Sequence, residues 1–321
     1  MERNEIIKSK VEADLSLDRA FIKGQALKVN NCWHFSTDGT SVDVMFFDKQ
    51  DFRDGMNRIY ILSARYEVTI LAFTLMDTHV HFIFYGEYDQ CNKFMHEYVR
   101  QISWNISVRH GERHKFRFDS IHHQKIDTDL YLKTAICYVI KNAPVGGIHY
   151  NAYDYPWSSA ALYFRDSGSW TSPQWTTGLV RSKDYHPGKT DMQTFLKTHT
   201  VPDQDYSVID GIVFPGEYVD YHLVERIFRT HKSFNYFMCV SKEKDVEERG
   251  GSISYLSLPM QEMRQHKTEI CRELYGNISI RSLNTSQRLR LARVLKSRYN
   301  SSPKQVARLC GLVYSEVKSM L

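Results

Sequence analysis

Two apolar runs joined by a three-residue link constrain the fold of this chain more than any other feature. Residues 68–75 and 79–85 are rich in β-branched and aromatic side chains, and the link over residues 76–78 predicts an antiparallel hairpin or a bent pair of strands. Successive side chains of a strand point to opposite faces, so His79 and His81 are predicted to share one face. Two neighbouring imidazoles are half of a metal site, or else a pair of histidines on a solvated face.

A predicted helix over residues 128–142 supplies partners for these histidines. Its apolar residues recur at helical spacing, at Leu132, Ala135, Ile136, Val139 and Ile140. Tyr138 and Asn142 are four residues apart and therefore share one face of the helix. Tyr138 offers a phenolic nucleophile, and Asn142 offers a neutral oxygen ligand. Together with the two histidines they make a constellation of functional groups rather than an isolated motif.

Three stretches of sequence resemble one known family. LMDTHVHFIF (residues 75–84), YVIKNAPVGG (138–147) and DYPWSSAALY (154–163) occur in this order. The pattern resembles the REP-associated tyrosine transposases, single-tyrosine HUH enzymes that cut and rejoin single-stranded DNA. In that family the corresponding stretches usually read like LMPNHVHLL, YIHxNPVRAG and DYPWSS. Asp77-Thr78 in place of Pro-Asn and the additional Ala143 depart from the pattern, but neither removes a candidate ligand or the tyrosine.

The resemblance covers roughly residues 25–165 and carries expectations about fold and activity. It implies an α+β, ferredoxin-like antiparallel sheet with helices, the HUH nuclease fold. It also implies that Tyr138 attacks DNA to form a covalent 5′-phosphotyrosine, and that the DNA it cuts is a hairpin of the REP type. His79, His81 and Asn142 would hold a divalent metal, Mg²⁺ or Mn²⁺, that polarises the scissile phosphate. Lys141, beside these residues, is expected to contact phosphate.

The sequence alone leaves alternatives for the activity, for the nucleophile and for the roles of other residues. A catalytically silent, domesticated regulator that binds hairpin DNA would share the same fold, although it would not require a tyrosine at position 138. Tyr131, seven residues earlier on the helix, is the competing nucleophile. Three further histidines are expected to be structural or to face DNA: His122, His123 and His149. Two aromatic residues could stack on bases or pack in the core: Tyr155 and Trp157.

The rest of the pattern predicts the domain organisation. Strands are expected over residues 29–35, 42–47, 68–75, 79–85 and 116–126, and helices over 49–65, 92–110 and 128–142. This order predicts a small antiparallel sheet with helices on one face. Residues 1–24 are expected to be a short helix or a loose tail, and the Ser-, Thr-, Asp- and Gly-rich interval 166–211 a linker or irregular arm. Residues 212–321 are expected to form an all-α C-terminal region.

The C-terminal region carries a basic stretch without acidic residues between Arg281 and Arg308. Such a stretch is typical of surfaces that bind nucleic acid. Residues 302–321 predict a helix-turn-helix with Gly311 at the turn, although ordinary helical bundles contain similar pairs. The residues expected to contact DNA are Arg288, Arg290, Arg293, Lys296, Arg298, Lys304, Arg308, Tyr314, Ser315 and Lys318.

Composition bounds the remaining classes of protein. The 321 residues suffice for two or three domains, and the net charge of +5 favours a polyanionic partner only weakly. The six cysteines are scattered, without a C-x-x-C pair, so no disulfide framework is predicted and a reducing cytoplasm is expected. Because DNA is the expected partner, the protein is expected to associate with the nucleoid. Neither a signal peptide nor a membrane span is expected. A monomer is preferred over a homodimer, because the C-terminal extension could take the place of a second subunit in holding DNA.

Overall fold

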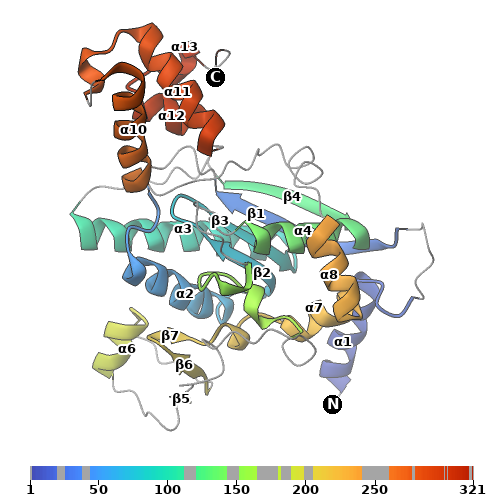
Figure 1. Cartoon of the computed structure of the whole chain (residues 1–321). Coiled ribbons are helices and arrows are strands. Elements are labelled where there is room, and N and C mark those ends of the chain that lie inside the picture. Colours follow the sequence, from blue (N-terminus) through green and yellow to red (C-terminus); the bar gives the residue numbers. More distant parts are fainter. Residues whose placement is uncertain are drawn as a thin grey trace.

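The structure, a computed structural model, is an α+β fold in which a four-stranded antiparallel sheet with helices is followed by a mostly helical C-terminal region (Figure 1). It describes residues 2–19, 26–37, 44–111, 121–142, 152–164, 180–181, 189–198, 205–240, 260–276, 279–299, 301, 303–317 and 320. The strands of the main sheet are β1 (Lys28–Thr37), β2 (Thr69–Leu75), β3 (Val80–Tyr85) and β4 (Ile121–Thr128), in the spatial order β2-β3-β1-β4.

Three helices alternate with the strands along the sequence, and together they cover both faces of the sheet. They are α2 (Lys49–Ser63), α3 (Tyr88–His110) and α4 (Asp129–Lys141). On one face Phe82 packs against Phe94 and Tyr98 of α3, with ring centroids 5.8 and 5.3 Å apart. On the other face the hydroxyl of Thr74 donates a hydrogen bond of 2.7 Å to the carbonyl oxygen of Val139 in α4. The prediction of helices on one face is therefore wrong, because the apolar stripe of α4 also has to be buried.

The strand predicted over residues 42–47 is absent from its described part, residues 44–47. The backbone N–H groups of Met45 and Phe46 instead donate to the carbonyl oxygen of Asp77, at 2.5 and 3.0 Å. Asp48 then caps α2 by accepting hydrogen bonds from the next turn. This segment therefore closes over the link that precedes His79 rather than adding a strand.

The other predicted elements around the sheet are confirmed, with small differences at their ends. The first helix, α1 (Glu2–Asp14), is formed, and its Asp14 carboxylate accepts hydrogen bonds from Asn31 of β1 and Tyr85 of β3. α3 begins four residues earlier than the pattern indicated, at Tyr88. β4 is described from Ile121, so the first residues of the strand predicted over 116–126 lie outside the described part of the chain.

A second, three-stranded sheet lies beside α2. Its strands are β5 (Val180–Arg181), β6 (Ser207–Ile209) and β7 (Ile212–Val213), and the helical elements beside it are α6 (Lys189–Phe195) and η5 (Pro215–Glu217). The next two helices, α7 (Tyr221–Phe228) and α8 (His231–Val240), pack against α4 instead. The side chain of Asn57 in α2 donates to the carbonyl oxygens of Phe195 and Gly211 and accepts from the N–H of Val213. The interval predicted to be a linker or arm thus contains packed elements, whereas the predicted domain boundaries remain predictions.

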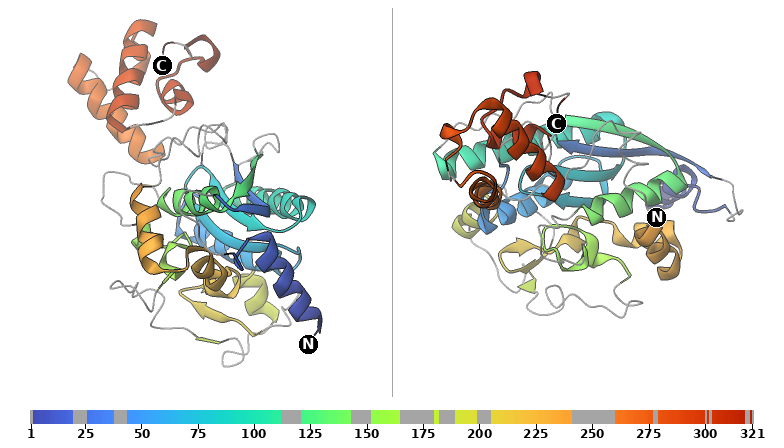
Figure 2. Two further views of the ribbon diagram at one scale, coloured as in Figure 1. Left: turned by 90° about the vertical axis from the view of Figure 1, so that its right-hand side faces the viewer. Right: turned by 45° about the horizontal axis from the view of Figure 1, so that its top comes forward.

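The C-terminal helices form a unit with its own core. They are α10 (Met260–Tyr275), η6 (Ile280–Ser282), α11 (Thr285–Tyr299), α12 (Pro303–Leu309) and α13 (Tyr314–Val317). Among the described residues, the buried side chains of this unit form a cluster separate from the one around the sheet. Figures 1 and 2 show the unit standing beyond the sheet and its helices. Of the helices in the described part of the chain, none has the length and apolar character that crossing a bilayer requires.

Replacing Phe82 with alanine is expected to lower the free energy of unfolding by about 3–5 kcal/mol, because a fully buried aromatic ring would leave a cavity. The ring also stacks on Phe84 at 5.3 Å. Urea unfolding followed by circular dichroism measures the change. Phe47→Ala is the control, since this side chain is 43% exposed. Equal unfolding midpoints for the two variants would contradict the packing described.

Candidate active site

The two histidines of the β3 segment lie on the face of the sheet that α4 covers. Their ring centroids are 5.0 Å apart, and the ring of His81 is 5.8 Å from that of Tyr138. Both imidazoles are buried. Phe82, the next residue, points to the opposite face, as the alternation along a strand requires.

Helix α4 carries Tyr138 and Asn142 to these histidines. The Thr128 side chain caps the helix by accepting from the N–H of Tyr131, and the Thr74 hydroxyl fixes its last turns through Val139. Asn142 is the C-terminal cap, and its Nδ2 lies 3.4 Å from Nε2 of His81. Rotation of this amide would bring its oxygen to the same place.

In each histidine Nδ1 faces a side chain that lies outside the predicted ligand set. The Thr78 hydroxyl lies 2.9 Å from Nδ1 of His79, and Nε2 of His34 lies 3.1 Å from Nδ1 of His81. Both histidines would therefore bind a cation through Nε2, as metal-bound histidines with a second hydrogen-bond partner commonly do. Because Nε2 of His81 faces the Asn142 amide, the residues fit a divalent ion with neutral nitrogen and oxygen ligands.

His34 of β1 also belongs to the candidate site, and it was not predicted from the sequence. It is buried, its ring stacks on His81 with centroids 5.3 Å apart, and its ring centroid lies 5.9 Å from that of Tyr138. The only signal in the sequence is the alternation over residues 32–36, which puts His34 on one face of its strand with Ser36. Nothing in that pattern tells which strand lies beside it.

Burial keeps the two stacked imidazoles neutral. Desolvation lowers the pKa of His34 to about 4. Desolvation, with smaller contributions from His79 and His34, also holds the pKa of His81 well below 6.5. A neutral imidazole keeps the lone pair that metal binding requires.

Acidification from pH 7.5 to 4.5 is expected to destabilise the fold through this pair. The unfolded histidines titrate near pH 6.5, so the unfolded chain binds more protons below that value, and the stability present above it is lost as pH falls toward 4. Each histidine contributes a slope of at most roughly 1.4 kcal/mol per pH unit. Urea midpoints measured across this range should fall less steeply for His34→Gln than for the wild type. Identical profiles would contradict the assignment.

DYPWSSAALY, residues 154–163, packs against the outer edge of β2. Ser158 forms a bridge with Thr74, and the N–H of Leu75 donates to the carbonyl oxygen of Trp157 at 2.9 Å. The flanking one-turn helices are η2 (Ala152–Asp154) and η3 (Ala160–Leu162). Tyr155 is buried and donates to the carbonyl oxygen of Leu75, while Trp157 stacks on Phe52 with centroids 5.1 Å apart. Both aromatic residues thus contribute to packing.

The remaining candidates near the site are placed as follows. Tyr131 is buried in the first turn of α4, and Lys141 is half-buried in the last. His122 and His123 are exposed on β4, and His122 shares a row across the sheet with Ser36 and His81. His149 and Ala143 lie outside the described residues.

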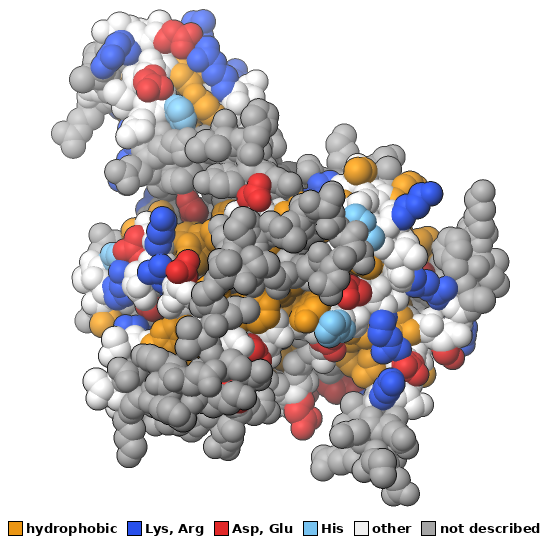
Figure 3. All heavy atoms as spheres, turned by 60° about the horizontal axis from the view of Figure 1, so that its bottom comes forward, with side chains coloured by type: hydrophobic (Ala, Val, Ile, Leu, Met, Phe, Trp, Pro, Cys, Tyr) orange, Lys and Arg blue, Asp and Glu red, His pale blue; other side chains and the backbone are white. Residues whose placement is uncertain are grey.

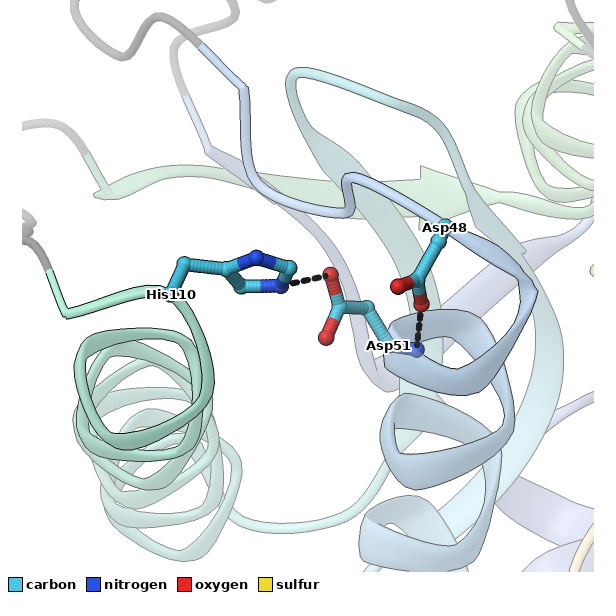
Figure 4. Close-up of side chains that lie close together, drawn as sticks. All are labelled: Asp48, Asp51 and His110. Atoms are coloured by element: carbon cyan, nitrogen blue, oxygen red, sulfur yellow. Dashed lines mark hydrogen bonds and ion pairs between the residues drawn. The ribbon is translucent and has the colours of Figure 1, made fainter.

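Asp48, Asp51 and His110 form another group with metal-ligand chemistry, between the start of α2 and the end of α3 (Figure 4). The carboxylate oxygens of the two aspartates already form hydrogen bonds and ion pairs. Arg109 forms ion pairs with both carboxylates and, through its hydrogen bond, lowers the pKa of Asp48. Asp51 also accepts from the N–H of Phe47 and faces Nε2 of His110 at 2.9 Å. The group is explained as a network that joins the two helices.

Several basic residues of the C-terminal unit make contacts within it. Arg288 donates to the carbonyl oxygens of Leu283 and Gly311, and Gly311 has a φ of +61° at the turn between α12 and α13. Arg293 donates to the carbonyl oxygen of Met320. Arg298 forms two hydrogen bonds of 2.9 Å with Glu273 of α10, an acid outside the basic stretch.

The other predicted DNA contacts differ in exposure. Arg290 and Arg308 are exposed, and Lys296 and Tyr314 are half-buried. The side chains of Lys304 and Ser315, and the whole of Lys318, lie outside the described part. Figure 3 shows Lys and Arg side chains on the outer end of the C-terminal unit, with acidic side chains among them.

Comparison of the chain with protein-family models, with curated proteins and with solved structures found no match.

Proposed function

We propose that the chain is a metal-dependent single-stranded DNA endonuclease and strand transferase of the transposase type. The observation that carries the proposal is the meeting of two elements: Nε2 of His81 on β3 lies 3.4 Å from the amide of Asn142 on α4, and the ring of Tyr138 lies beside the same histidine. These contacts support the proposal, because they bring the candidate ligands and the candidate nucleophile close together.

The arrangement of the sheet supports the same proposal. Its elements follow one another as β1-α2-β2-β3-α3-β4, in the spatial order β2-β3-β1-β4. This is the order of a ferredoxin-like fold, the fold that the resemblance to HUH nucleases implies. In this proposal the nuclease domain extends over residues 25–165, and α4 adds the tyrosine to the face that α2 and α3 leave open.

The reaction follows from the nucleophile. The phenolic oxygen of Tyr138 gives up its proton and forms a bond to phosphorus, while the bond from phosphorus to the 3′ oxygen breaks and that oxygen takes up a proton, so no net proton is gained or lost. A divalent cation, when bound by His79, His81 and Asn142, would neutralise charge on the phosphate. The protein remains joined to the 5′ phosphate, so a 3′ hydroxyl from another strand can reverse the step and complete strand transfer.

The C-terminal unit would bind the DNA that is cut. α12, the turn at Gly311 and α13 follow one another as in a helix-turn-helix, in which the second helix enters the major groove. Arg290 and Arg308 are exposed, and in this proposal they contact phosphates of the DNA. The duplex stem of a DNA hairpin would supply the groove, and a monomer would suffice to hold it.

The proposal is tested with a pool of hairpin single strands labelled at the 5′ or 3′ end, incubated with the full chain and Mn²⁺. A covalent adduct that carries the 3′ label, with release of a 5′-labelled fragment ending in a hydroxyl, is expected. Binding of hairpin DNA without any adduct, with Mg²⁺ or Mn²⁺, would instead support the catalytically silent regulator.

A further inference from the structure

We propose that His34 is a positioning residue that holds His81 with its Nε2 toward Asn142, and thereby sets the affinity of the site for a divalent cation. The inference rests on the function proposed above. It depends on the 3.1 Å contact between Nε2 of His34 and Nδ1 of His81, both of which belong to buried side chains.

The contact restricts where the protons lie on the two rings. When His81 binds an ion through Nε2, its Nδ1 carries the proton and donates it to Nε2 of His34. His34 must then be neutral, with its own proton on Nδ1. Only this pair of tautomers provides both a hydrogen bond between the rings and a lone pair directed at Asn142.

The position of His34 is fixed on both sides by the sheet. β1 is an inner strand, and His34 lies opposite Ile83 of β3 and Gln124 of β4. Its ring stacks on His81 at an interplanar angle of 23° and meets the ring of Tyr138 edge-on, at 77°. One side chain on a rigid strand therefore contacts both a predicted ligand and the predicted nucleophile.

Thr78 makes a corresponding contact with Nδ1 of His79, at 2.9 Å. The two ligands of the pair are thus held from different directions, one by its neighbour in the sequence and one by the adjacent strand. The first partner is visible in the sequence as Asp77-Thr78, where the transposase pattern has Pro-Asn. The second becomes visible only when β1 and β3 are paired.

The test compares His34→Phe, which keeps an aromatic ring but removes the acceptor, with His34→Gln, which can present an amide oxygen to Nδ1 of His81. Calorimetric titration with Mn²⁺ is expected to show an affinity about 10–100-fold weaker for His34→Phe, the usual effect of losing such a partner. His34→Gln should recover most of it. Nitrogen-15 NMR of the metal-free protein should show His81 protonated at Nδ1 in the wild type and redistributed in His34→Phe. His122→Gln, an exposed histidine on the same face, is the control.

The outcomes separate this inference from the proposed function. Wild-type Mn²⁺ affinity and an unchanged His81 tautomer in folded His34→Phe would overturn the positioning role, even if the wild type cuts DNA. If His34→Phe loses Mn²⁺ affinity as expected but the wild type never forms a DNA adduct, the positioning role of His34 is supported and the proposed nuclease activity is contradicted. Equal losses of affinity in His34→Phe and His34→Gln would overturn the positioning role, because restoring an acceptor at position 34 would then have no effect. A wild type that binds no Mn²⁺ would overturn the inference directly.

Discussion

Replacing Tyr138 with phenylalanine is expected to abolish the covalent protein–DNA adduct and to slow strand cleavage by at least about 10³-fold, because the variant lacks the attacking oxygen. The phenyl ring retains the edge contacts with His34 and His81, so the site should keep its packing. Gel electrophoresis under denaturing conditions measures the adduct, and release of the 5′-labelled fragment measures cleavage. Binding of hairpin DNA should change little.

The matched control for this experiment is Tyr131→Phe. Tyr131 and Tyr138 lie on the same helix and both are buried, so the two variants test the same kind of change at two turns of α4. Tyr131→Phe should form the adduct at the wild-type rate. An adduct that survives Tyr138→Phe and disappears in Tyr131→Phe would transfer the nucleophile to the first turn of the helix.

Replacing His79 with alanine is expected to lower Mn²⁺-dependent cleavage by roughly 10²–10³-fold, since a cation in such a site stabilises charge on the phosphate by several kcal/mol. His79 is replaced rather than His81 because the contact between His34 and His81 does not involve its ring. Calorimetry should show weaker Mn²⁺ binding in parallel. Removal of metal by a chelator should reproduce the loss in the wild type, and added Mn²⁺ should reverse it.

His122→Ala is the control for this second prediction. His122 is an exposed histidine in the row of the sheet that contains His81, so its removal changes the same residue type on the same face. It should leave Mn²⁺ affinity unchanged. Cleavage by His79→Ala at the wild-type rate, or cleavage that persists in the presence of chelator, would exclude the metal role assigned to this pair.

The sequence allowed much of the sheet and of its helices to be predicted, because these depend on local patterns. The alternation around His81 and the helical spacing around Tyr138 each report burial within a single element. The failed strand over residues 42–47 has a similar local pattern. Its outcome was decided by a distant group, the carbonyl oxygen of Asp77, to which two of its N–H groups donate.

His34 could not be found by the same reasoning, because its role depends on strand order. β1 pairs with β3 rather than with β2, the next strand in the sequence, and that pairing brings His34 to His81. The number of basic residues in a stretch likewise does not predict which of them are available to bind DNA. It does not reveal that Arg298 forms an ion pair with Glu273 or that Arg288 donates to the carbonyl oxygen of Gly311 at the turn.

The two separate clusters of buried side chains have a consequence for how such a protein can change over generations. A substitution in the core of α10 to α13 meets no buried partner from the cluster around the sheet among the described residues. For the function proposed, variation could therefore retune which DNA is chosen without disturbing the chemistry, and a different recognition module could be joined after α8 by recombination. Target preference and catalysis would then evolve at independent rates within one gene.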